Sequence, residues 1–241
     1  MAAKSIPAEG SEQQSAVSVP GANPGTLPEL NEDQALALLQ RSEVTVETLV
    51  SLARNPSATK SRKVAIGLIL HPRTPRHVSL PMLRRLFTFD LMRVALTPAV
   101  AADVKRAAEE QIMNRLESLS SGEKISLARR ASGRVAAALL RDLESRIVAT
   151  ALENPHLTEA YVVAFLTKPD ASASLFEVVG AHPKWSLRRE VQIALLGSEN
   201  TPIERVKEFA GNFSEQFLCE VVPEGRLSLI GGKFSGISSS K

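Results

Sequence analysis

The sequence predicts an all-α protein, an α-solenoid in which many short helices stack in series, with disordered termini. Aromatic residues make up only 4% of the 241 residues, so a core must come from Leu, Val, Ile and Ala, which suits closely packed helices. Short amphipathic segments of about ten residues follow one another between Pro-containing turns. The prolines at positions 155, 169 and 183 are 14 residues apart, which indicates a repeated unit.

The chain divides into three predicted regions. Residues 1–28 are rich in Ser, Pro, Gly, Ala and Gln and lack apolar periodicity, which is typical of a disordered tail. Residues 29–212 form the predicted solenoid domain. Residues 213–241 form a C-terminal extension in which "QFLCEVVPEGRLSLIGG" alternates like a strand, so the pattern favours a short hairpin around "PEG" followed by a disordered tail.

Helices in the first half of the solenoid begin and end at recognisable signals. "NEDQALALLQ" opens with Asn31 as N-cap and Gln34 at the capping-box position. "TVETLVSLAR" ends at an Asn-Pro pair and "KSRKVAIGLIL" ends at a His-Pro pair. The next helix is predicted to begin with Thr74 as N-cap and Pro75 at the first helical position. Pro81 should kink or shorten this helix.

The second half continues in the same way. "VALTPAVAADVKRAAEEQIMNRL" places one apolar stripe on a helix, made of Val100, Val104, Ala108, Ile112 and Leu116. "SSGEKISLARRA" opens with a capping box of Ser120 and Glu123. "RVAAALLRD", "SRIVATALE", "AYVVAFLTK", "SLFEVVGA" and "SLRREVQIALLGSEN" are the helices expected after it. Such short helices bury a face only by stacking on neighbours, which is the logic of a solenoid.

Three stretches carry a resemblance to known repeat proteins. "LLRDLESRIVATALENP" resembles a HEAT-type unit. "ENPHLTEAYVVAFL" and "HPKWSLRREVQIALLGSENTP" resemble the repeats of leucine-rich-repeat-variant and other HEAT-like bacterial proteins. The likeness covers residues 30–210 and implies a HEAT-like α-solenoid, but its motifs are packing motifs and specify no chemistry. Some repeat-variant proteins carry a cysteine cluster that this chain lacks, so the resemblance implies no iron–sulfur role.

Composition and motifs point away from several classes of protein. The single cysteine, Cys219, excludes an internal disulfide and a Cys-clustered metal site. The N-terminal stretch has no apolar signal core, and no apolar run approaches the roughly 18 residues of a membrane helix. We therefore expect a cytoplasmic protein with no membrane partner.

Two of the four histidines, His71 and His182, are interpreted as structural residues. His71 and His182 stand directly before Pro at helix ends, where a residue that tolerates the left-handed conformation can cap the helix. His156 is expected in an exposed turn, and His77 belongs to no motif. No HExxH, G-x-S-x-G or phosphate-loop motif occurs. We predict a non-enzymatic protein with no catalytic, cofactor-binding or metal-binding residue.

Charge is distributed unevenly along the chain. Residues 1–53 carry two Lys or Arg and seven Asp or Glu, whereas residues 54–93 carry nine Lys or Arg and one acid, Asp90. The candidate binding residues of this basic segment are Lys60, Arg62, Lys63, Arg73, Arg76, Arg84, Arg85 and Arg93. They either form a patch for a polyanion or an acidic partner, or they are solvated and paired with the acidic neighbouring segment.

These observations predict a scaffold that binds a protein or peptide partner on one face of the solenoid. Many modest contacts on a preformed surface would supply the affinity at a low ordering cost. The alternative function is nucleic-acid binding through the basic segment 54–93, with an affinity that falls steeply as salt rises.

Overall fold

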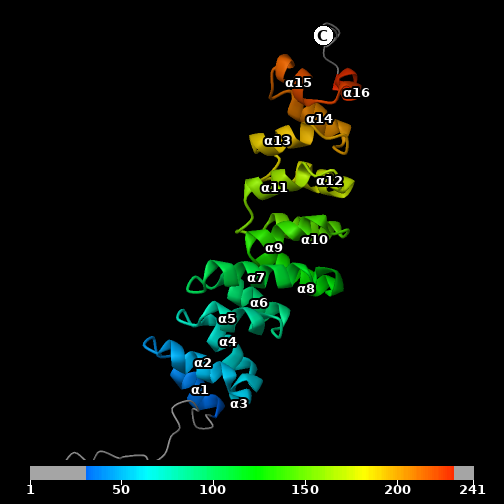
Figure 1. Ribbon diagram of the computed structural model, residues 1–241. Coiled ribbons are helices and arrows are strands. Elements are labelled where there is room, and N and C mark those ends of the chain that lie inside the picture. Colours follow the sequence, from blue (N-terminus) through cyan, green and yellow to red (C-terminus); the bar gives the residue numbers. More distant parts are fainter. Residues whose placement is uncertain (1–30, 231–241) are drawn as a thin grey trace, which may run out of the picture.

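The computed structural model describes residues 31–230, which form an elongated stack of α-helices from α1 (Glu32–Leu39) to α16 (Glu224–Leu227) (Figure 1). This range contains no strand. The prediction of an all-α solenoid is therefore confirmed. The two predicted disordered tails, residues 1–28 and the segment after Ile230, lie outside the described residues.

The stack consists of two-helix units. The first helices are α1, α4 (Arg62–Leu70), α6 (Thr88–Leu96), α8 (Ser121–Arg130), α10 (Ser145–Leu152), α12 (Ala173–Ala181) and α14 (Ile203–Ala210). The second helices are α2 (Val46–Arg54), α5 (Arg76–Leu83), α7 (Ala102–Met113), α9 (Gly133–Ala138), α11 (Glu159–Leu166), α13 (Arg189–Leu196) and α15 (Glu215–Val221). Between or after them lie α3 (Pro56–Lys60), η1 (Leu116–Ser118), η2 (Leu139–Arg141), α16 and η3 (Ser228–Ile230). The second helices begin at residues 46, 76, 102, 133, 159, 189 and 215, so a unit recurs every 26 to 31 residues.

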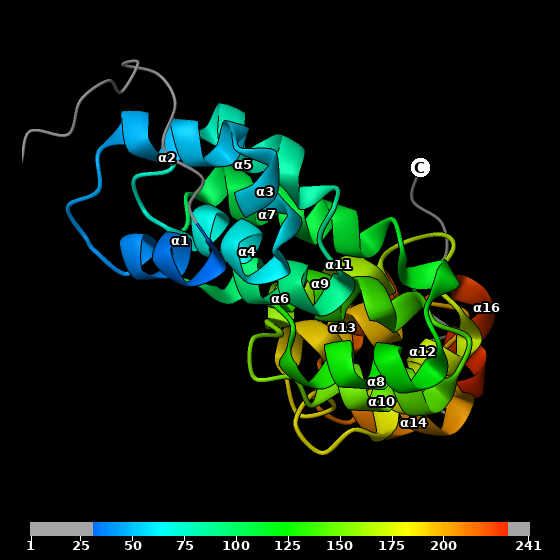
Figure 2. The same cartoon turned by 90° about the horizontal axis from the view of Figure 1, so that it is seen from below.

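In neighbouring units, first helices pack against first helices and second helices pack against second helices. The second helices α5, α7, α9, α11 and α13 contact one another in series. Among the first helices, α4 contacts both α1 and α6, and α10 contacts both α8 and α12. Seen along the stack, α9, α11 and α13 fall together beside α8, α10, α12 and α14 (Figure 2). The sequence spacing of the prolines therefore reflects a two-row solenoid.

Capping boxes open two of the helices, as predicted. Asn31 and Gln34 exchange side-chain and backbone hydrogen bonds at the start of α1, and Ser120 and Glu123 do so at the start of α8. The hydroxyl and the backbone N–H of Ser120 both donate to the Glu123 carboxylate and lower the pKa of Glu123. These caps satisfy N–H groups that a helix start would otherwise leave unpaired.

The Thr-Pro pairs work differently from the prediction. Pro75, and not Thr74, occupies the N-cap position of α5. The Thr74 hydroxyl instead donates to the carbonyl oxygen of Leu68 at 2.6 Å, and Thr201 donates to Leu195 in the same way at 2.6 Å. Each threonine closes the turn by satisfying a carbonyl at the end of the preceding helix. The residue before proline avoids the helical region, and this explains the extended turn.

Asn154 anchors the turn between α10 and α11 to the preceding unit. Its side chain is fully buried, and its amide donates to the carbonyl oxygens of Ala128 at 2.7 Å and Ala131 at 3.1 Å, at the end of α8. Its Oδ1 accepts a hydrogen bond from the backbone N–H of His156 at 2.7 Å. This asparagine therefore joins two units as well as ending a helix.

His71 has a similar role at the end of α4. The ring donates from Nε2 to the carbonyl oxygen of Arg41 and accepts the backbone N–H of Arg73 on Nδ1. The predicted left-handed caps are wrong, because His71 has φ −72° and His182 has φ −76° in the extended region. The following proline imposes this conformation. At His182 the contact to the preceding unit comes from Trp185, which is buried and donates from Nε1 to Leu152 at 2.8 Å.

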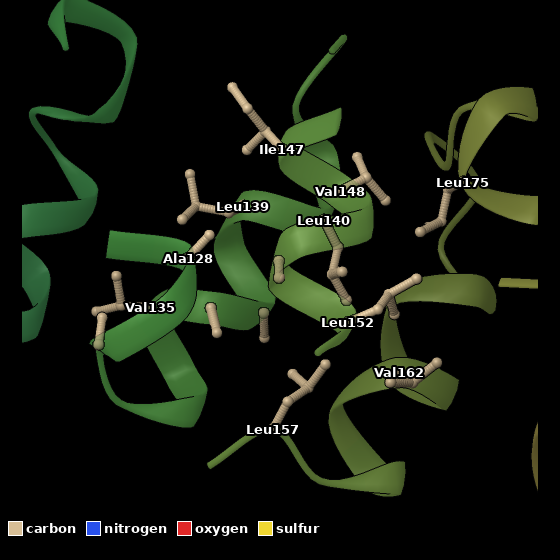
Figure 3. Packing of buried hydrophobic residues seen from close by; sticks show 14 of the residues in the cluster. Ala128, Val135, Leu139, Leu140, Ile147, Val148, Leu152, Leu157, Val162 and Leu175 are labelled. Carbon is tan, nitrogen blue, oxygen red and sulfur yellow. The ribbon is translucent and has the colours of Figure 1, made fainter. Parts of the chain in front are cut away.

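Buried aliphatic side chains form one long core and one short core. The short core lies under α1 to α4 and contains Leu49, Leu52 and Val64, and the long core continues to α15. Met82 of α5 packs against both. Figure 3 shows how Leu140, Val148, Leu152, Val162 and Leu175 converge between neighbouring units. Of the predicted apolar stripe, Val104, Ala108 and Ile112 are buried on α7, Val100 is buried just before the helix and Leu116 is half-buried just after it.

The predicted C-terminal hairpin is wrong. Ser214 caps α15, which buries Leu218, and Pro223 opens the short helix α16. Leu218 and Val222 belong to the long core, so the solenoid continues beyond the predicted boundary at residue 212 to Ile230. The β-branched run is too short to specify a strand once its apolar residues find a helical neighbour.

Candidate functional site

All eight basic candidates are exposed at the surface. Three of them form ion pairs, which join Arg62 to Asp90, Lys63 to Glu32 and Arg76 to Asp103. The remaining five form no ion pair with another described residue, and they are Lys60, Arg73, Arg84, Arg85 and Arg93. Glu32 belongs to the acidic segment, so the two charge blocks meet at one pair only among residues 31–230.

Contacts between units define one edge of the stack. Arg62 at the start of α4 binds Asp90 in the first turn of α6, so these first helices begin on the same side. Arg115, just after α7, donates to the carbonyl oxygen of Leu86, just before α6. Second helices therefore end where first helices begin. We call this side the inter-unit edge, and it carries the connections at residues 55–61, 84–87, 114–120, 139–144 and 167–172.

The basic candidates are divided between this edge and the opposite one. Those at the inter-unit edge are Lys60, Arg62, Lys63, Arg84 and Arg85. Those at the opposite edge are Arg73 in the turn after α4, Arg76 at the start of α5 and Arg93 in the last turn of α6. The segment 54–93 thus forms two smaller groups of cations, separated by the length of a helix.

Phe87 lies exposed among the cations of the inter-unit edge. It occupies the N-cap position of α6, makes no capping hydrogen bond there and is 65% exposed. The guanidinium of Arg62 lies 4.9 Å from the centre of its ring. The same guanidinium donates two hydrogen bonds of 2.7 Å to the buried carboxylate of Asp90, which raise the pKa of Arg62. Asp90 thereby holds the arginine in place beside the ring.

Arg115 fixes the turn that presents Phe87. Its guanidinium donates to the carbonyl oxygens of Leu86 at 2.7 Å and Arg84 at 3.2 Å. Arg115 was not among the predicted residues, because it lies in the next unit and its role depends on a contact 29 residues away in sequence. The side chains of Arg84 and Arg85, which this held backbone carries, are exposed to solvent.

Leu143 lies in the connection before α10, two units further along the same edge. It directly precedes Glu144, the N-cap of α10, and it is 91% exposed. Neither Phe87 nor Leu143 belongs to a hydrophobic core. A large apolar residue next to a helix start contributes neither capping nor burial, so these two positions are locally unfavourable for folding. Leu187, which precedes the N-cap of α13 at the opposite edge, shows the same conflict, so Phe87 and Leu143 are distinguished by lying together on one edge beside cations and a pocket.

A surface pocket of about 500 Å³ lies on this edge beside the connection that carries Leu143, and its lining runs from Met113 to Lys168. Its apolar lining includes Met113, Leu116 and Phe165, and its polar lining includes Lys124 and Asp142. Lys124 and Asp142 form an ion pair of 2.8 Å that is largely buried. Burial opposes ionisation of Asp142, but hydrogen bonds from Lys124 and nearby backbone N–H groups outweigh it and lower the pKa of this carboxyl. Lys124 and Asp142 therefore neutralise each other's charge in the wall of the pocket.

A second pocket, of about 610 Å³, lies on the other side of α9. His156 and Tyr161 line it, together with Arg134, whose guanidinium lies 3.5 Å from Glu109 and 3.4 Å from Glu110. His156 is exposed, as predicted, but it faces this pocket. Arg134 is thus paired with two acids, whereas Arg106, which also lines the pocket, forms no ion pair with a described residue.

Comparison with known proteins finds no family model, curated protein or solved structure that matches this chain. Within residues 31–230, no group of three or more His, Cys, Asp or Glu side chains is arranged to hold a metal ion. In the same range, no helix has both the length and the apolar character needed to cross a membrane.

Proposed function

We propose that this protein is a non-enzymatic, HEAT-like scaffold that binds a protein partner along its inter-unit edge. The observation that carries the proposal is the pair of exposed apolar side chains, Phe87 and Leu143, beside the first turns of α6 and α10 on one edge of the stack. Exposed apolar groups next to cations and a surface pocket are what a partner buries on binding. Rigid stacked helices hold them in a fixed arrangement, which lowers the ordering cost of association.

The test compares the proteins captured from cell lysate by wild type and by a Phe87→Ser, Leu143→Ser double variant, with nuclease present. The partner should bind wild type and be lost from the double variant. Leu187→Ser is the matched control, because Leu187 is 78% exposed in the turn between α12 and α13 at the opposite edge. Equal capture by wild type and the double variant would show that the edge is not the interface.

Nucleic-acid binding is the second candidate function. It is favoured by Lys60, Arg84 and Arg85, which are exposed at one edge without an ion-pair partner among the described residues. Each phosphate that these cations neutralise should make log affinity fall with log salt by a slope of about 0.7 to 0.9. Affinity for a DNA or RNA oligonucleotide that is absent, or flat across salt, would rule this candidate out.

A further inference from the structure

We propose that the partner contributes an extended acidic peptide segment with two apolar side chains about six residues apart. This inference rests on the proposed function and specifies the chemistry of what lies on the inter-unit edge. It follows from three features of that edge: the spacing of its exposed apolar residues, the pocket beside Leu143 and the gradient of charge along the edge.

The spacing comes from the stacking of the second helices. The connections that carry Phe87 and Leu143 leave the ends of α5 and α9, which are separated by α7 in one continuous row. Packed helices lie about 8 to 10 Å apart, so two steps along the row cover about 20 Å. An extended chain rises about 3.3 Å per residue, and about six residues span that distance with both side chains on the same face. A helix would need about 13 residues for it.

The pocket gives the segment a place to lie beside its Leu143 anchor. Its lining begins near Leu116, next to the Arg115 that holds the Phe87 turn, passes Asp142, next to Leu143, and reaches Lys168 in the following connection. Its apolar floor of Met113, Leu116 and Phe165 can accept a side chain from the middle of the segment. The ring of Phe165 is also covered by the ammonium of Lys168 at 3.8 Å, so a cation borders the floor.

Among the described residues, the edge has more unpaired cations at its Phe87 end than at its Leu143 end, and this difference determines at which end of the bound segment the acidic residues lie. At the Phe87 end, Lys60, Arg84 and Arg85 have no acidic partner among the described residues. At the Leu143 end, Lys124 binds Asp142 and Arg141 binds Asp170 at 2.5 Å, which leaves Lys168 as the cation of the pocket lining without an ion pair to a described residue. The acids of the partner therefore belong at the Phe87 end, where they can form charge-assisted hydrogen bonds with arginine.

The same gradient favours a peptide over a nucleic acid. A phosphodiester strand carries a charge at every nucleotide, so it would meet the exposed Glu117 and Glu144 further along the edge. An exposed leucine also offers no ring on which a base can stack, whereas Leu143 suits an aliphatic or aromatic side chain. A peptide can place acids at one end and apolar groups at the other.

The test selects binders to the full-length protein from a displayed library of random peptides about a dozen residues long. Enriched sequences should combine acids at one end with two apolar residues about six positions apart. Substitution of either apolar residue in a synthetic, fluorescent copy should weaken binding about tenfold in fluorescence anisotropy, and Lys in place of the acids should weaken it similarly. Phe87→Ser and Leu143→Ser should each weaken binding about tenfold, and Leu187→Ser should leave it unchanged.

Several outcomes would overturn the inference. One is enrichment of basic sequences, or of apolar residues at helical spacing. A second is the absence of any enriched sequence. A third is tighter, salt-sensitive binding of an oligothymidine probe at the same residues. If the edge variants lose the captured partner but the selected peptide does not compete with that partner, the inference fails while the proposed function stands.

Discussion

Close packing at Gly133 shows how a single residue limits the distance between two units. A Cβ at this position would lie 2.1 Å from the backbone oxygen of His156, which cannot move aside like a side chain. We expect Gly133→Ala to destabilise the protein by about 2 to 3 kcal/mol. Gly122→Ala is the control, because a Cβ there meets nothing within 4 Å and α8 should gain up to about 1 kcal/mol. Urea unfolding followed by Trp185 fluorescence measures both, and equal effects of the two variants would contradict the close approach.

The buried amide of Asn154 gives a second prediction at this scale. Asn154→Ala leaves the carbonyl oxygens of Ala128 and Ala131 without that donor, so the free energy of unfolding should fall by about 2 to 4 kcal/mol. Asn154→Asp keeps the acceptor for the His156 N–H but turns an oxygen toward the two carbonyls, so it should not rescue stability. Recovery of wild-type stability by aspartate would show that only the acceptor matters.

At the scale of the element, the end of α12 should be sensitive to pH. Burial is the main cause that lowers the pKa of His182 below its ordinary value of 6.5; Glu153 opposes the shift and Lys184 adds to it. The unfolded chain binds the proton more tightly, so the stabilising contribution is complete above pH 6.5 and is lost as the pH falls below it. His182→Asn, which can accept the Lys184 N–H as Asn154 accepts that of His156, should remove this dependence. Denaturant unfolding of both proteins over this pH range provides the measurement, and parallel curves would contradict the expectation.

A substitution at the start of α6 should affect binding without a matching loss of stability. Phe87→Ser places a good N-cap where a phenylalanine makes no cap, so the free energy of unfolding should stay within about 1 kcal/mol of wild type or rise. Binding of the partner should nevertheless weaken, because the exposed ring is gone. A loss of stability well beyond this range would assign the ring a structural role, and thermal unfolding of the two proteins distinguishes the cases.

The cores predict uneven stability over the whole molecule. The core under α1 to α4 is much smaller than the one that continues to α15, and Met82 connects them. In a solenoid, stability sums over units and their interfaces. Hydrogen exchange should therefore be faster in α1 to α4 than in α8 to α12, and Met82→Ala should widen the difference. Uniform exchange along the stack would indicate a single cooperative core instead.

How far the sequence predicts this molecule depends on the range over which each signal acts. Capping boxes and the apolar stripe of α7 are local patterns, and the structure confirms them. The hairpin around "PEG" is wrong because a short apolar run cannot distinguish a strand from a helix without knowledge of its neighbours. The inter-unit edge could not be predicted because Phe87, Arg115 and Leu143 belong to three units and come together only when the units stack.

The contacts that join the units also govern how the chain acquires its fold. Among residues 31–230, no side-chain hydrogen bond joins residues more than 33 positions apart, the distance from Trp185 to Leu152. Each unit therefore forms these contacts with the unit synthesised just before it, and no segment depends on contacts with a distant part of the sequence. Loop-closure entropy stays small and contact order stays low, which favours rapid folding. Such a chain can fold from its N-terminal end while it is still emerging from the ribosome, one unit at a time.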